Sequence, residues 1–89
     1  MTEPSTTVPA AVATAILTVL HDTGRDATQV EPTMLLAADL GLDSLDLAQT
    51  IVLLERSLGI DPFRTAATAG RPTLRTVGDL ISIYLAALP

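Results

Sequence analysis

Apolar residues recur at helical spacing in three segments of the chain. Residues three and four apart share one face of a helix, so the first segment predicts an amphipathic helix over about residues 9–21. Pro9 fits its first position, where the missing N–H costs nothing, and Asp22-Thr23-Gly24 ends it. His21 falls in the last turn, where an imidazole suits the negative end of the helix dipole. The apolar face of this segment contains Val12, Ala13, Ile16, Leu17 and Leu20.

The second segment, residues 44–58, has apolar residues on two faces. The face expected to pack on the core contains Leu47, Thr50, Ile51, Leu54 and Leu58. The opposite face contains Leu45, Ala48, Gln49, Val52 and Arg56. Within it, the three apolar residues form a strip away from the core, and such a strip usually marks a partner surface. The alternative is that this helix is central and buried on all sides.

The third segment predicts a helix over 76–87, with Thr76 as the N-cap. Asp79, three residues on, makes a weaker version of the capping box. Its core face contains Val77, Leu80, Ile81, Tyr84, Leu85 and Leu88. Between the second and third segments, Gly59 fits a helix stop, and residues 64–69 are weakly helical.

The rest of the chain connects these segments. Residues 1–7 resemble a flexible tail, so a single domain is expected over 8–89. Residues 22–43 form a connection longer than the ~12–15 residues usual for a loop. Its apolar stretch, residues 34–38, is expected to dock on the helices or to form a short helical turn. Phe63 and Tyr84 are the only aromatic residues, so the core is expected to be aliphatic, with both rings as plain packing.

Composition and charge narrow the range of possible functions. The chain has 89 residues, no cysteine and a net charge of −5, which excludes disulfides and disfavours nucleic acid, since that partner needs a basic surface. No apolar run is long enough to span a membrane, and no signal peptide is recognised. A cytoplasmic domain is therefore expected. Partners with positive patches are favoured.

Ser44 is the candidate functional residue. It begins the second helix, but the chain has no lysine and only one, distant histidine, and a hydroxyl without a general base is a poor nucleophile. A serine hydrolase is therefore disfavoured. Asp43 or Ser44 could simply cap the helix. A helix N-terminus is also an anion site, so a phosphodiester attached to Ser44 would be well placed there.

The sequence on both sides of Ser44 favours modification of this serine over a capping role alone. Residues 39–46 are Asp39-Leu40-Gly41-Leu42-Asp43-Ser44-Leu45-Asp46, which resembles D-L-G-x-D-S-L-D, the phosphopantetheine attachment motif of acyl carrier proteins. The run Arg75-Thr76-Val77-Gly78-Asp79-Leu80 also resembles K-T-V-G-D-L of that family. The resemblance implies an all-α, four-helix carrier-protein bundle with three main helices, one short helix and a long first loop. It also implies that Ser44 carries 4′-phosphopantetheine from coenzyme A, with Asp43 helping the transferase and its Mg²⁺ engage the serine.

The resemblance further implies a monomeric carrier without catalytic activity, which holds acyl intermediates as thioesters. Its expected partners are a phosphopantetheinyl transferase, an acyltransferase or acyl-activating ligase, and a ketosynthase or other pathway enzymes. The implied partner surface comprises Leu45, Asp46, Ala48, Gln49, Val52, Glu55 and Arg56.

Two departures from the family pattern bear on the pathway. Gln49 and Arg56 stand where carriers of fatty-acid synthesis usually have acids. This favours a discrete carrier of polyketide or related specialised metabolism. The alternatives are a fatty-acid carrier, an aminoacyl or peptidyl carrier, and an interaction domain that keeps the fold but is never modified.

Overall fold

The computed structural model describes residues 4–26, 28–60, 62 and 74–87. These residues form three helices, α1 (Pro4–Asp22), α2 (Ser44–Leu58) and α4 (Val77–Ala86). They contain no strand, only one isolated antiparallel bridge between Leu35 and Thr76. None of the described helices is long and apolar enough to cross a membrane. The short helix predicted at 64–69 lies outside the described residues, as do Phe63 and Leu88.

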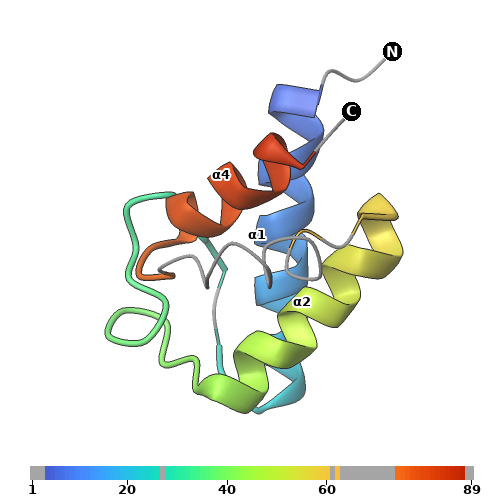
Figure 1. The fold of residues 1–89 in the computed structure, drawn as a ribbon. Coiled ribbons are helices and arrows are strands. Elements are labelled where there is room, and N and C mark those ends of the chain that lie inside the picture. Colours follow the sequence, from blue (N-terminus) through green and yellow to red (C-terminus); the bar gives the residue numbers. More distant parts are fainter. Residues whose placement is uncertain (1–3, 27, 61, 63–73, 88–89) are drawn as a thin grey trace.

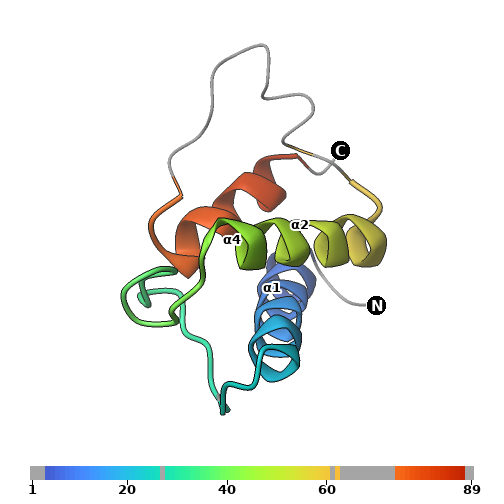
Figure 2. The same ribbon diagram turned by 90° about the horizontal axis from the view of Figure 1, so that it is seen from below.

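Helix α1 is the central element of the bundle. It packs against both α2 and α4, and each of these contacts is more extensive than the contact between α2 and α4. Figures 1 and 2 show α2 crossing α1 on one side while α4 covers its N-terminal half. The all-helical bundle predicted from the sequence is confirmed by this arrangement.

Helix α1 differs from its predicted form at its beginning. It starts at Pro4 rather than near residue 9, so Pro9 lies inside the helix and the predicted tail overlaps it. Val8 is 1% exposed, and burial of a valine contributes about 1.5–3 kcal/mol, which favours the longer helix. The predicted apolar face was wrong at Ala13 and Leu17, which are only half-buried. Neighbours on two sides of α1 place a different set in the core: Val8, Val12, Ala15, Ile16, Val19 and Leu20.

Helix α2 has the predicted bounds, and its C-terminus ends as expected. Gly59 adopts the left-handed conformation, with φ of 69°, which glycine accepts without the steric cost of a Cβ atom. Its N–H donates to the carbonyl oxygen of Glu55 at 2.8 Å.

Helix α4 begins after the predicted cap. The Thr76 hydroxyl accepts a hydrogen bond from the Asp79 N–H at 3.1 Å, and an Asp79 carboxylate oxygen accepts one from the Thr76 N–H at 3.0 Å. The two bonds form a complete capping box, so aspartate serves here where glutamate or glutamine is usual.

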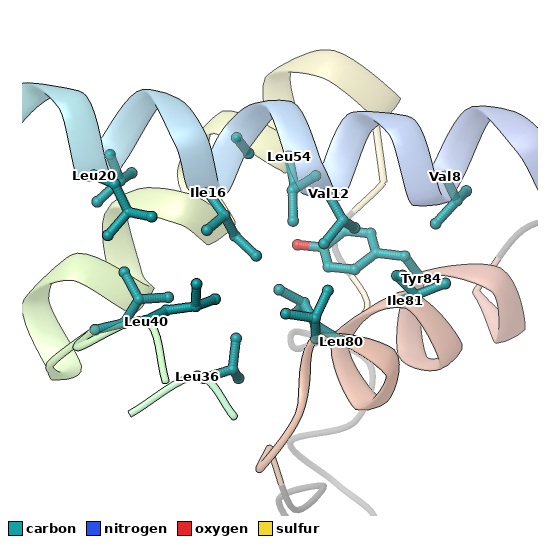
Figure 3. Close-up of a cluster of buried hydrophobic side chains, with 14 residues drawn as sticks. Val8, Val12, Ile16, Leu20, Leu36, Leu40, Leu54, Leu80, Ile81 and Tyr84 are labelled. Atoms are coloured by element: carbon teal, nitrogen blue, oxygen red, sulfur yellow. The ribbon is translucent and has the colours of Figure 1, made fainter. Parts of the chain in front are cut away.

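The core lies where the three helices and the long connection meet (Figure 3). The connection contributes Leu36 and Leu40, which confirms that its apolar stretch docks on the helices. Leu36 N–H donates to the Arg75 carbonyl at 2.9 Å, which ties the connection to the segment before α4. Tyr84 is fully buried and faces Val12 of α1 (Figure 3), so its predicted role in packing is confirmed.

Candidate functional site

Ser44 is the first residue of α2, and its side chain is exposed. The residue before it, Asp43, is the N-cap, with an extended backbone at φ −91° and ψ −176°. The first N–H groups of a helix have no acceptor within the helix, and those of Ser44 and Leu45 belong to this first turn. Together with the positive end of the helix dipole, they favour a phosphate at this position.

Asp43 and Asp46 hold the start of α2 by a reciprocal capping box. The Asp43 Oδ1 accepts from the Asp46 N–H at 2.8 Å, and the Asp46 Oδ2 accepts from the Asp43 N–H at 3.3 Å. Asp43 is therefore the N-cap that the sequence left open between it and Ser44. Because Asp43 caps the helix, the Ser44 hydroxyl takes no part in the cap. The hydroxyl is therefore accessible for modification.

Asp46 does not lie on the expected partner surface. Its side chain is 8% exposed, and its Oδ2 also pairs with the Arg25 Nη1 at 3.0 Å. The hydrogen bond from Arg25, followed by that from the Asp43 backbone N–H, holds the pKa of the Asp46 carboxyl below its usual range. The carboxylate is thus turned inward because a cation and the helix cap both bind it there.

Arg25 is the residue at this site that sequence reasoning missed. It lies 21 residues before its partner, beyond the reach of any helical spacing. The one signal in the sequence that could have pointed to Arg25 is its isolation, because no other arginine precedes Arg56.

A shallow groove of about 370 Å³ opens beside Ser44. That size is at the low end for small-molecule sites. Most of its lining is apolar, with Asp43, Ser44 and Arg75 as the polar members. The groove contains neither histidine nor lysine among its described lining residues, so nothing there activates the serine as a hydrolase would require. The lining comprises Leu35, Leu36, Ala37, Ala38, Leu42, Asp43, Ser44, Leu47, Leu74 and Arg75.

The outer face of α2 is exposed, as expected from the two-sided pattern. Leu45 is 66% exposed and Val52 47%, while Thr50 and Leu54 on the opposite face are fully buried. The alternative of a helix buried on all sides is therefore wrong. Ala48, Gln49, Glu55 and Arg56 are also exposed. A second groove, of about 400 Å³, runs beside this face toward the end of α1, and it is lined by Val19, Asp22, Thr23, Ala48, Gln49, Val52 and Leu53.

Comparison with known proteins identifies the family. The family model described as a phosphopantetheine attachment site matches residues 11–81, a range that includes all of α2, most of α1 and the first half of α4. No curated protein matches the chain significantly. Proteins of this family carry covalently attached 4′-phosphopantetheine, are generally non-catalytic, and generally interact with a phosphopantetheinyl transferase and with pathway enzymes. An exposed serine at a helix N-terminus, without a general base, fits that cofactor, and the chain belongs to the phosphopantetheine attachment family, consistent with an acyl carrier protein.

Proposed function

We propose that Ser44 is the attachment site of 4′-phosphopantetheine and that the protein is an acyl carrier. The observation that supports this most directly is the exposed Ser44 hydroxyl at the first position of α2, outside a cap made by Asp43 and Asp46. The chain has no cysteine, so the thiol that holds the acyl group as a thioester belongs to the arm. The protein itself then needs no catalytic group.

Attachment is a phosphoryl transfer to the serine. The Ser44 Oγ attacks the pantetheine-side phosphorus of coenzyme A, a P–O bond to the adenosine bisphosphate breaks, and the hydroxyl proton passes to a base of the transferase. Because the described lining of the groove contains no histidine or lysine beside Ser44, and Asp43 is engaged in the helix cap, we assign that base to the transferase. Asp43, whose second carboxylate oxygen is outside the capping bond, is the residue we assign to engagement of the transferase and its Mg²⁺. The donor places the reaction in a compartment that contains coenzyme A, such as the cytoplasm.

The outer face of α2 is the proposed docking surface for partner enzymes, and it comprises Leu45, Ala48, Gln49, Val52, Glu55 and Arg56. A carrier must bind and leave its enzymes in turn, so we expect a small interface, below about 1,200 Å². The exposed Leu45 and Val52 supply its apolar centre, where single side chains contribute most to binding.

The charge of this face favours specialised metabolism of the polyketide type. Arg56 is exposed in the last turn of α2, where it repels a basic groove and suits an acidic residue of the partner. An acyltransferase or acyl-activating ligase and a ketosynthase are the proposed pathway partners. A fatty-acid carrier and an aminoacyl or peptidyl carrier remain the alternatives for the pathway, since both would use the same arm.

The test of the attachment site is the intact mass after incubation with coenzyme A and a broad-specificity phosphopantetheinyl transferase. We expect wild type to gain one phosphopantetheine group and Ser44→Ala to gain none. Ser57→Ala is the matched control, because Ser57 is an exposed serine of the same helix, far from its N-terminus, and this variant should be modified like wild type. Modification of Ser44→Ala would overturn the assignment, and an unmodified wild type would favour the unmodified interaction domain.

A further inference from the structure

The end of α1 and the start of α2 are joined by one ion pair. Arg25 follows α1, and its backbone N–H donates to the Leu20 carbonyl at 2.8 Å, so its main chain is anchored to the last turn of that helix. Its Nη1 lies 3.0 Å from the Asp46 Oδ2 in the first turn of α2. Gly41 lies beside this ion pair: a Cβ atom there would be at ordinary van der Waals distance, 4.0 Å, from the Arg25 guanidinium, and it is the positive φ of 69° that favours glycine.

The ion pair acts on the residues beside Ser44 through one shared oxygen. The Asp46 Oδ2 that accepts from Arg25 is the same atom that accepts from the Asp43 N–H. Asp43 in turn accepts from the Asp46 N–H. The contacts therefore form a continuous chain from Arg25 to the N-cap immediately before the serine.

The Arg25 cation offsets a repulsion within the α2 cap. Asp43 and Asp46 bring two carboxylates into one helix turn, and like charges at that separation repel. The Asp46 side chain is 8% exposed, whereas that of Arg25 is 39% exposed. A buried carboxylate without its partner is strongly unfavourable, so loss of Arg25 would turn Asp46 outward and release the Asp43 N–H.

We propose that Arg25 is a positioning residue for the modification of Ser44, acting through Asp46 and the Asp43 cap to hold the serine and its neighbouring acid in one geometry. This inference rests on the proposed function of Ser44. Preorganisation of reacting groups contributes to rate because the geometry need not be reached anew in each encounter. Arg25 binds Asp46 and not the serine, so its assigned role is positioning and not catalysis.

The competing explanation is that Arg25 changes only the net charge that a transferase meets. The two explanations predict different changes in KM and kcat. Arg25→Gln makes the chain more negative and Asp46→Asn makes it less negative, so an effect of net charge moves KM in opposite directions. An effect of positioning lowers kcat in both variants, since each breaks the same contact.

The experiment measures the initial rate of phosphopantetheine transfer against carrier concentration for wild type, Arg25→Gln, Asp46→Asn, the double variant and Arg25→Lys. All rates are taken below the lowest melting temperature of the set. Asp26→Asn is the control, because it removes a negative charge from an exposed side chain of the same loop without touching the ion pair. Amide hydrogen exchange of Asp43 and Asp46 provides a second readout that does not depend on the transferase.

We expect kcat to fall about tenfold in both single variants, less than the hundredfold that a ~1 Å misplacement can cost. The double variant should be no slower than the slower single variant, Arg25→Lys should recover part of the rate, and the two amides should exchange faster without Arg25. Unchanged kcat in Arg25→Gln, or KM shifts of opposite sign with unchanged kcat, would overturn the positioning role while leaving the attachment site intact. Wild type that gains no mass would overturn the proposed function itself.

Discussion

At the residue scale, the described helices α2 and α4 both begin with a capping box. In each, an aspartate three residues after the N-cap turns back and binds the N-cap N–H, Asp46 in α2 and Asp79 in α4. The pKa of each carboxyl is lowered: at Asp46 by the hydrogen bond from Arg25 first and the capping bond next, and at Asp79 by the capping bond first. The two differ in surroundings: of these two carboxylates, only Asp46 is also paired with a cation in the described structure, and that pairing turns it away from the proposed docking surface.

Asp79 should make the stability of the domain depend on pH in acid. Hydrogen bonds from the Thr76 N–H first, and the Arg75 N–H next, lower its pKa. The stabilisation is therefore complete above the ordinary aspartate pKa of about 3.9 and is lost as pH falls through the lower pKa of the folded state. We expect Asp79→Asn to be less stable than wild type at neutral pH, with the difference shrinking in acid.

Urea denaturation of both proteins at neutral and acidic pH measures this difference. Asp26→Asn, at an exposed position, is the control for removal of a carboxylate. A difference between Asp79→Asn and wild type that stays constant with pH would show that the Asp79 charge does not stabilise the cap.

At the element scale, α2 has one buried face and one exposed face. Leu54 is fully buried against the core, and Thr50 beside it is buried with its hydroxyl donating to the Asp46 carbonyl at 2.9 Å. The opposite face is exposed and includes Val52. The buried face therefore contributes to folding, and the exposed face is the one left open for the proposed docking surface.

Substitution on the two faces should have unequal cost. Leu54→Ala removes a fully buried side chain and should lower the free energy of unfolding by about 2–5 kcal/mol. Val52→Asp, on the outer face, should change it by within about 0.5 kcal/mol. Chemical denaturation of both variants is the measurement, and equal losses would mean that Val52 packs into the core.

At the scale of the whole molecule, the position of α1 between α2 and α4 leaves the outer side of α2 open. The same arrangement places Ser44 at one end of that side and Arg56 near the other. A partner enzyme docked along α2 would thus meet the arm and the charge of the last turn together. The proposed docking surface and the proposed attachment site therefore lie on one helix.

Partner choice should therefore respond to charge at Arg56. Arg56→Glu should lower acyl transfer by the cognate enzymes and raise transfer by fatty-acid enzymes with basic docking grooves, whereas Val52→Asp should lower both by removing an apolar contact. Steady-state transfer onto the holo protein by the two enzyme sets measures this, with a thermal melt to confirm folding. If neither substitution alters transfer, the docking surface is elsewhere.

The sequence by itself determined the parts of this protein whose causes are local. The bounds of α2, the cap at Thr76, the stop at Gly59 and the two faces of α2 all depend on residues within about one helical turn of each other. For the same reason, the amino-acid order alone is enough to place Ser44 at a helix start within its motif.

Tertiary structure alone decided the features that depend on distant residues. The start of α1 at Pro4 depends on burial of Val8 in a core shared with α4, and the groove beside Ser44 joins the long connection to Leu74 and Arg75. The inward turn of Asp46 depends on Arg25, at the end of another helix. Spacing along one helix carries no information on what packs against it, so the pattern of α2 predicts an exposed aspartate in its first turn, whereas the fold places a guanidinium beside it.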